Sequence, residues 1–253
     1  MSLTYKTIRY HVDNGIGRIV LNRPEKRNAL NQELLEELHH AVRDSASDSA
    51  VRVVLLSGAG ADFCSGADLS GLQRAFDAGV LEQMSDARRL ANLFQDMRRH
   101  PRPIIAAVRG RALAGGCGLA TACDLILAAE SAQFGYPEVN IGFVPAIVMA
   151  ILRRSVPEKH AFELITLGEI YSAQNFGLVN QVFADQTFDL DVDVYASKMA
   201  AKSPSALQLC KSLLYQMDGM SFDHALEAGV QVNAIARMTD DCKRGIERFL
   251  KKT

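Results

Sequence analysis

Short apolar runs alternate with helical spacings along the first half of the chain. The runs are rich in β-branched residues and too short for helices, which is typical of buried strands. They are Gly17–Leu21, Arg52–Ser57, Pro103–Val108, Leu125–Ala129 and, further on, Val179–Phe183. Between the first two runs, apolar residues recur at helical spacing over Asn31–Ser45, with Asn31 as the expected N-cap. Strands separated by helical crossovers predict a mostly parallel α/β core.

The pattern changes after about residue 155, where helical spacings dominate. We expect helices at Pro157–Leu167, Tyr171–Gly177, Asp191–Lys202, Pro204–Met217 and Phe222–Met238, followed by a basic tail, Cys242–Lys252. No stretch rich in Pro, Gly or Ser separates these segments. The sequence therefore predicts an α/β core over residues 1–190 and a helical region over residues 191–253.

Composition narrows the class of protein. The 253 residues carry 28 Lys+Arg against 29 Asp+Glu, a net charge of −1 that argues against a general nucleic-acid binder. No apolar run approaches the roughly 18–20 residues of a membrane span. The start of the chain lacks the apolar stretch of a signal peptide. The 5 cysteines are scattered without a CxxC pair, as expected for free thiols in a reducing compartment. We therefore expect a cytoplasmic protein without a membrane partner.

Glycine is concentrated in one part of the chain. Two glycine-rich segments, residues 62–69 and 110–120, each follow an expected strand, and the second runs into a helix of small residues. Free backbone amides at such a helix start can receive an anion or a developing oxyanion. The alternative is that the glycines only permit tight turns and close packing. The sequence lacks the phosphate-loop, dinucleotide and serine-hydrolase motifs, and its 6 histidines lack metal-ligand spacing. We therefore expect no metal site.

Three further motifs add to these two segments. They are Leu21–Leu30, with the sequence LNRPEKRNAL; Phe134–Gly142, with the sequence FGYPEVNIG; and the residues from Leu167 to Val179. With these five ordered motifs, nearly the whole chain resembles the enoyl-CoA hydratase/isomerase (crotonase) family. The resemblance implies an α/β fold made of a spiral of ββα units with a helical C-terminal region. It also implies a homotrimer, commonly assembled as a dimer of trimers.

The resemblance further implies an acyl-CoA substrate and an enolate held by two backbone amides, those of Ala67 and Gly115. Coenzyme A is part of the substrate, so no separate cofactor is expected. The positions that match CoA contacts of the family are Lys26, Arg27, Ala29, Ser65, Ala67 and Leu69, together with Phe249 and Lys252, which would reach CoA on a neighbouring subunit. The alternatives are a solvated turn at Lys26 and Arg27 and a solvated helix end at the tail.

The acid/base residues depart from the family pattern. Hydratases of the family use two glutamates; the second corresponds to Glu138, whereas Gly118 stands in place of the first. One carboxylate beside an oxyanion hole suffices to move a proton between the α and γ carbons, so we expect Δ3–Δ2 isomerisation. Hydration and a catalytically silent CoA-binding protein are the alternatives. Apolar neighbours should raise the pKa of Glu138, unless it lies in a solvated turn.

Two further expectations concern the neighbourhood of these residues. Restoring the missing acid by Gly118→Glu should raise hydration if the site is otherwise intact. The apolar segment Phe143–Met149 fits either a hydrophobic acyl pocket or the start of a buried helix.

Overall fold

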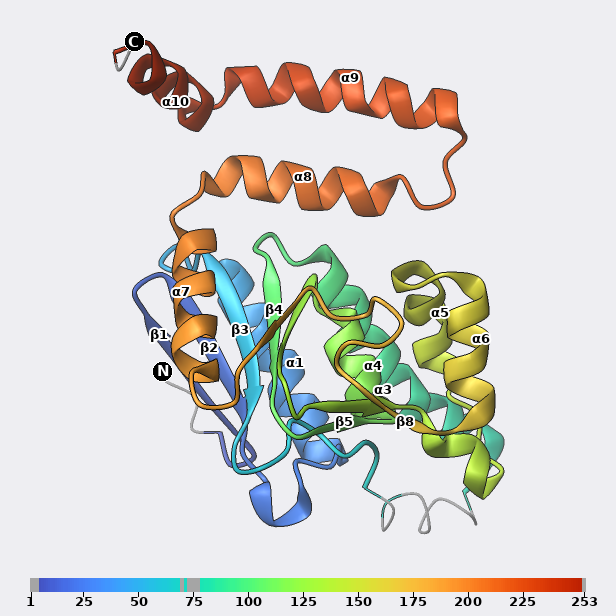
Figure 1. Ribbon diagram of the computed structural model, residues 1–253. Helices are drawn as coiled ribbons and strands as arrows, with labels where there is room; N and C mark the ends of the chain where they lie inside the picture. Colours follow the sequence, from blue (N-terminus) through green and yellow to red (C-terminus); the bar gives the residue numbers. More distant parts are fainter. Residues whose placement is uncertain (1–4, 69–70, 72–77, 252–253) are drawn as a thin grey trace.

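The core of the protein is a six-stranded sheet in the order β1-β2-β3-β4-β6-β9 (Figure 1). This computed structural model describes residues 5–68, 71 and 78–251. β1 runs antiparallel to β2, and the other neighbouring strands pair in parallel, as the sequence predicts. The strands of this sheet are β1 (Ile8–Asp13), β2 (Ile16–Leu21), β3 (Val53–Gly58), β4 (Ile104–Val108), β6 (Leu125–Ala129) and β9 (Gln181–Phe183).

Helices cover both faces of this sheet, which explains why its central strands are apolar throughout. β4 is buried along its whole length, as expected for a strand with no solvent-facing side. The helices of the α/β part are α1 (Gln32–Ser47), α3 (Val80–Arg99), α4 (Gly115–Ala122), α5 (Ala146–Ser155), α6 (Glu158–Leu167) and α7 (Phe188–Ala200), with short 3-10 turns η1 (Pro24–Lys26) and η3 (Pro137–Ile141). The predicted cap is confirmed, because the Asn31 side chain accepts a hydrogen bond from the amide of Leu34 at 2.9 Å.

A second, three-stranded sheet corrects one sequence prediction. It consists of β5 (Arg111–Leu113), β7 (Gln133–Gly135) and β8 (Ile170–Ser172). The helix predicted over Tyr171–Gly177 is wrong, because this segment begins as β8, antiparallel to β7. It then turns through Phe176 and Gly177, whose φ angles of 65° and 68° lie in the left-handed region and are incompatible with a right-handed helix.

The C-terminal helices form a layer beside the core. α8 (Pro204–Gln216) and α9 (Phe222–Met238) run as an antiparallel pair, and α10 (Asp240–Leu250) lies at the far end of α9 (Figure 1). α7 crosses the predicted boundary at residue 190 and contributes Phe188, Val192 and Ala196 to the core. The division into a core and a C-terminal region stays a prediction. Among the described helices, none is long and apolar enough to cross a membrane.

A buried ion pair fastens α8 to the core. The Lys211 ammonium donates to the Asp124 carboxylate at 2.7 Å and to the backbone oxygens of Met97 and Arg102. Asp124 also accepts from the Tyr215 hydroxyl and, at 2.6 Å, from the amide of Ile104 at the start of β4. Asp124 therefore joins the start of β4, a central strand of the sheet, to α8.

Candidate functional site

The two glycine-rich segments lie side by side, although 40 residues separate them in the sequence. Cys64 forms a β-bridge with Ala112, and the amide of Leu113 donates to the backbone oxygen of Cys64 at 3.0 Å. Gly66 makes this approach feasible: its φ is 100°, and a Cβ there would lie 2.7 Å from the Cβ of Ala114. Glycine is therefore required at residue 66 by both its conformation and its packing.

This packing brings together the two amides that the sequence singled out. A Cβ built on Gly115 would lie 4.0 Å from the amide nitrogen of Ala67. Neither amide donates a hydrogen bond within the described part of the chain. Gly115 is the first residue of α4, where the helix dipole favours negative charge. Two unused amides at one place, one of them at a helix start, can stabilise an oxyanion.

The turn before α4 is held in a strained conformation. Ala114 has φ 52° and ψ −128°, which a residue with a side chain rarely adopts. Its amide donates to the backbone oxygen of Gly135 at 2.8 Å, and its own oxygen accepts from the amide of Gly118 at 3.0 Å. Contacts on both sides thus keep the chain in the direction that presents the Gly115 amide.

Glu138 lies in η3, three residues beyond β7, and it is buried. Only 9% of its surface is exposed, and its Oε2 has no hydrogen-bond partner among the described residues. Burial raises the pKa of this carboxyl above its ordinary value, as the sequence predicts, while its own backbone amide opposes the rise. The solvated-turn alternative is therefore wrong. A buried carboxyl with a raised pKa and a free oxygen can serve as a general acid or base.

Two neutral groups lie within electrostatic reach of Glu138. Burial, with a smaller contribution from the charge of Glu138, raises the pKa of the Cys117 thiol to about 11. The same causes, with Cys117 itself, raise the pKa of the fully buried Tyr136 phenol. Cys117 belongs to α4 and interacts electrostatically with Glu138. Glu138 therefore lies near the helix that presents the Gly115 amide.

The space of a side chain at residue 118, the position of the missing acid, is taken by Val148. A Cβ at Gly118 would lie 2.1 Å from Cγ1 of Val148 in α5 and 3.6 Å from Cζ of Phe94 in α3. The condition for Gly118→Glu to raise hydration, an otherwise intact site, is therefore not met. Sequence reasoning missed Phe94 because it did not predict α3, and it placed Val148 in an apolar segment without relating it to Gly118. Val148 is buried in a helix, whereas Phe143 and Val144 in the same apolar segment are exposed.

The predicted CoA positions are brought together in part. The amide of Ser65 donates to the backbone oxygen of Arg27 at 3.0 Å, so the 26–30 loop lies along the Ala67 turn. Lys26 and Arg27 are exposed and Ala29 is buried. Leu69 and Lys252 lie outside the described residues. Phe249 is exposed in α10, at the far end of the C-terminal helices from this loop (Figure 1).

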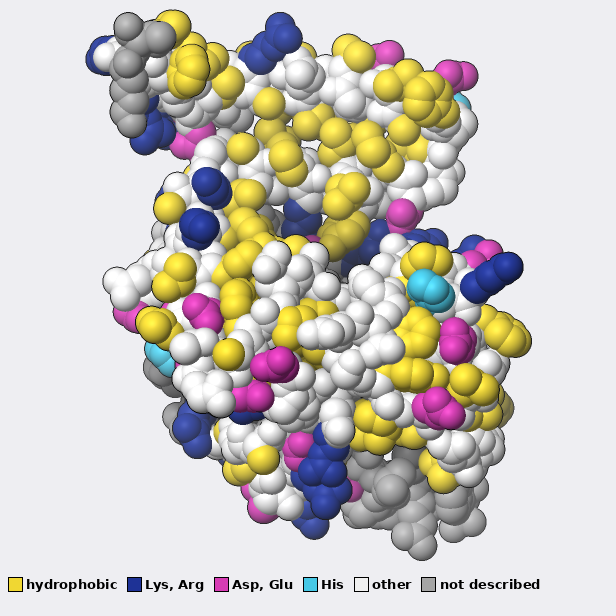
Figure 2. Space-filling view, in the orientation of Figure 1, with side chains coloured by type: hydrophobic (Ala, Val, Ile, Leu, Met, Phe, Trp, Pro, Cys, Tyr) yellow, Lys and Arg dark blue, Asp and Glu magenta, His cyan; other side chains and the backbone are white. Residues whose placement is uncertain are grey.

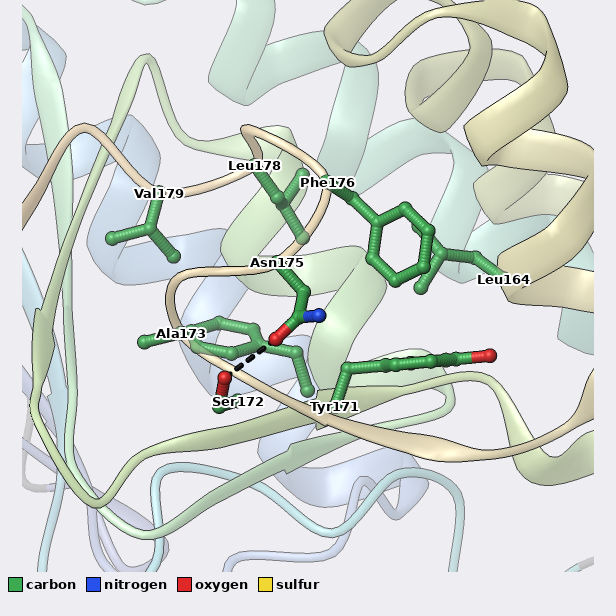
Figure 3. Close-up of a pocket in the computed structure, with 9 residues that line it drawn as sticks. Leu164, Tyr171, Ser172, Ala173, Asn175, Phe176, Leu178 and Val179 are labelled. Atoms are coloured by element: carbon green, nitrogen blue, oxygen red, sulfur yellow. Dashed lines mark hydrogen bonds between the residues drawn. The ribbon is translucent and has the colours of Figure 1, made fainter.

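Hollows elsewhere in the molecule do not belong to this site. One, of about 10 Å³, lies between α6 and the chain after β8, with Leu164, Tyr171 and Phe176 among its lining residues (Figure 3). It has room for roughly one water molecule. Another, of about 190 Å³, lies between the six-stranded sheet and α7. Its Arg18 and Arg109 are paired with Asp193 and Asp189, at 2.7 and 2.9 Å.

The chain is similar to known proteins over nearly its whole length. The profile of the family described as enoyl-CoA hydratase/isomerase matches residues 11–253. The 2,3-dehydroadipyl-CoA hydratase of Escherichia coli is 37% identical over 239 residues, which cover 92% of this chain and 91% of that protein.

Solved structures show the same arrangement of the chain. Human enoyl-CoA hydratase domain-containing protein 3 superposes with a TM-score of 0.93 at 30% identity, covering 98% of both chains. An enoyl-CoA hydratase of Mycobacterium smegmatis gives a TM-score of 0.93 at 31% identity, covering 98% of this chain and 97% of that one.

Proposed function

Because the chain belongs to the enoyl-CoA hydratase/isomerase family, with its crotonase-like α/β fold and its acyl-CoA substrates, we propose that it moves a proton within an enoyl-CoA and uses Glu138 as its single acid and base. One observation carries this proposal. Glu138 is a buried carboxyl with an oxygen that has no hydrogen-bond partner among the described residues, while the space of a side chain at residue 118 is taken by Val148.

The proposed reaction is the isomerisation of a 3-enoyl-CoA to a 2-enoyl-CoA. Glu138 removes a proton from C2, and the electrons pass into the thioester oxygen, which the amides of Ala67 and Gly115 stabilise. The protonated Glu138 then returns the proton to C4, and the double bond comes to lie between C2 and C3. Each amide of this kind contributes about 3 kcal/mol to lowering the barrier. The reaction needs no water and no second carboxyl.

Hydration is the second candidate, because the E. coli relative is named a hydratase of a 2,3-unsaturated thioester. The two reactions are separated by incubating the protein with a 3-enoyl-CoA and, in parallel, with crotonyl-CoA. We expect faster conversion of the 3-enoyl-CoA, and loss of this conversion in Glu138→Gln. Fast hydration of crotonyl-CoA that survives Glu138→Gln would contradict the single-base proposal. Acyl-CoA binding in a calorimeter without turnover of either thioester would indicate a silent family member.

We further propose that CoA binds along the exposed loop at Lys26 and Arg27 and passes Ala29, Ser65 and the Ala67 turn. The hydrogen bond between Ser65 and Arg27 supports this path, because it joins the loop to the proposed oxyanion site. Removing both cations, by Lys26→Ala and Arg27→Ala, should raise the KM for acyl-CoA and leave kcat largely unchanged. An unchanged KM would contradict this path.

The C-terminal helices support the proposal of a homotrimer or a dimer of trimers. Figure 2 shows apolar side chains over α8 and α9, on a layer that stands away from the core. The largest exposed ones are Leu214, Phe222, Leu226, Val230, Ile235 and Met238. A cluster of exposed apolar side chains on one layer is typical of a protein interface. Sedimentation equilibrium should give a mass of three or six chains, and a stable monomer would contradict the proposal.

A further inference from the structure

Gly118 stands in the middle of α4, although glycine is a poor helix former. The packing of Val148 against this position explains why a glycine is found there. Cγ1 and Cβ of Val148 lie 2.1 and 2.9 Å from the place of a Cβ at residue 118. Both are shorter than any normal carbon–carbon contact, so Val148 already occupies the space of a side chain at this position.

The filled space adjoins the proposed oxyanion site. Residues 115 and 118 are three apart in α4 and are therefore neighbours on the helix surface. A Cβ on Gly115 would lie 3.4 Å from Cδ1 of Leu30, while a Cβ on Gly118 would meet Val148 and Phe94. All three of these side chains are buried, with 7%, 3% and 5% of their surfaces exposed. An apolar wall, made of Leu30 at Gly115 and of Val148 and Phe94 at Gly118, thus lies along this part of α4.

This apolar wall affects whether the site favours isomerisation or hydration of an enoyl-CoA. A buried water needs two to four polar partners to be held in place. Leu30, Val148 and Phe94 offer none. In the part of the chain that the structure describes, the ionisable groups that interact electrostatically with Glu138 are the Cys117 thiol and the Tyr136 phenol, and both are protonated at neutral pH because burial raises their pKa values. The wall therefore provides neither a second base nor a hydrogen bond for an attacking water.

We propose that Val148, supported by Phe94, determines the reaction specificity of this site: it takes the space of a side chain at residue 118 and keeps water from adding to the bound enoyl-CoA. The inference rests on the proposed function, because it assumes that Glu138 and the two amides act on an enoyl-CoA. Val148 is a specificity-determining residue and takes no part in proton transfer.

The first test uses Val148→Thr, which keeps nearly the same shape and adds a hydroxyl that can hold a water. Conversion of a 3-enoyl-CoA and hydration of crotonyl-CoA to 3-hydroxybutyryl-CoA are measured on the same preparation. We expect the ratio of hydration to isomerisation to rise by about tenfold, a small part of the gain that positioned proton transfer can give. The matched control is Val192→Thr in α7, where the valine is also 3% exposed and lies against the sheet. It should leave the ratio unchanged.

The second test compares Gly118→Glu alone with Gly118→Glu combined with Val148→Ala, which opens space for the new side chain. Gly118→Glu alone should hydrate crotonyl-CoA no faster than the unaltered protein, whereas Gly118→Glu combined with Val148→Ala should hydrate it about 100-fold faster. Equal hydration by the single and double variants would overturn the inference, and so would an unchanged ratio in Val148→Thr.

Failure of the proposed function gives a different result. It would appear as an unaltered protein that turns over neither thioester, irrespective of residue 148. In that case, a gain of hydration confined to the double variant would still support the role of Val148, and no gain in either variant would overturn it.

Discussion

The packing of Val148 against Gly118 predicts a strong coupling between two small substitutions. In Gly118→Ala, the new Cβ would lie 2.1 Å from Cγ1 of Val148, about 1.4 Å short of the ~3.5 Å at which carbon atoms normally touch. Overpacking of this kind costs about 1–3 kcal/mol. Replacing glycine by alanine inside a helix gains about 1 kcal/mol. The net expectation is a loss of about 1 kcal/mol in the free energy of unfolding.

The sign should reverse when Val148 is shortened. Val148→Ala removes two buried methyl groups and should cost about 2 kcal/mol. In that background the methyl group at residue 118 enters the space that Val148 has left, so Gly118→Ala should now stabilise the protein by about 1 kcal/mol. The coupling energy between the two substitutions is thus about 2 kcal/mol.

Urea unfolding, followed by far-ultraviolet circular dichroism at one protein concentration, measures all four proteins of this cycle. The control cycle pairs Gly118→Ala with Val192→Ala, which should be additive within about 0.5 kcal/mol because Val192 lies in α7 on the sheet. If Gly118→Ala stabilised the unaltered protein by about 1 kcal/mol, as at an unhindered helical glycine, the reasoning would be refuted.

Three further changes test other parts of the structure. Glu138→Gln should raise the melting temperature at pH 7 but not near pH 4. Burial raises the folded-state pKa of Glu138, so the ionised carboxyl destabilises the fold as the pH rises above 4.5, the ordinary pKa of a glutamate. An equal gain at both pH values would contradict this reasoning. Lys211→Met should cost about 3 kcal/mol in urea unfolding, because it leaves the Asp124 carboxylate buried without its cation; a change under about 1 kcal/mol would show that the pair does not fasten α8. Asn31→Ala should cost about 1 kcal/mol by removing the α1 cap, whereas Asn31→Ser should cost little.

Local signals account for the parts of the fold that could be predicted. β6 spans Leu125–Ala129 and α9 spans Phe222–Met238, both with the predicted bounds, since a buried apolar run and a continuous helical spacing carry their own information. β8 could not be read in this way: its three residues form a strand only because they pair with β7. The helix Val80–Arg99 was missed because most of its first half is exposed and its apolar spacing begins late, towards Leu93 and Met97.

The candidate site, too, could be predicted from the sequence only in part. The resemblance to the family pointed to Glu138, Ala67 and Gly115, and the apolar neighbours of Glu138 predicted its raised pKa. Yet Val139 and Ile141, two of those neighbours, are exposed, so the burial of Glu138 comes mainly from other elements. Contacts between distant helices, such as Val148 on Gly118, leave no pattern in the sequence around either residue.

The most direct test of the account is the effect of Glu138→Gln on proton transfer at C2 of an acyl-CoA. Nuclear magnetic resonance in D2O follows the exchange of the C2 protons, and the conversion of a 3-enoyl-CoA is measured on the same samples. We predict that the unaltered protein catalyses both reactions and that Glu138→Gln slows both by at least about 100-fold while still binding acyl-CoA. A Glu138→Gln protein that exchanges the C2 protons as fast as the unaltered protein would show that another group is the base.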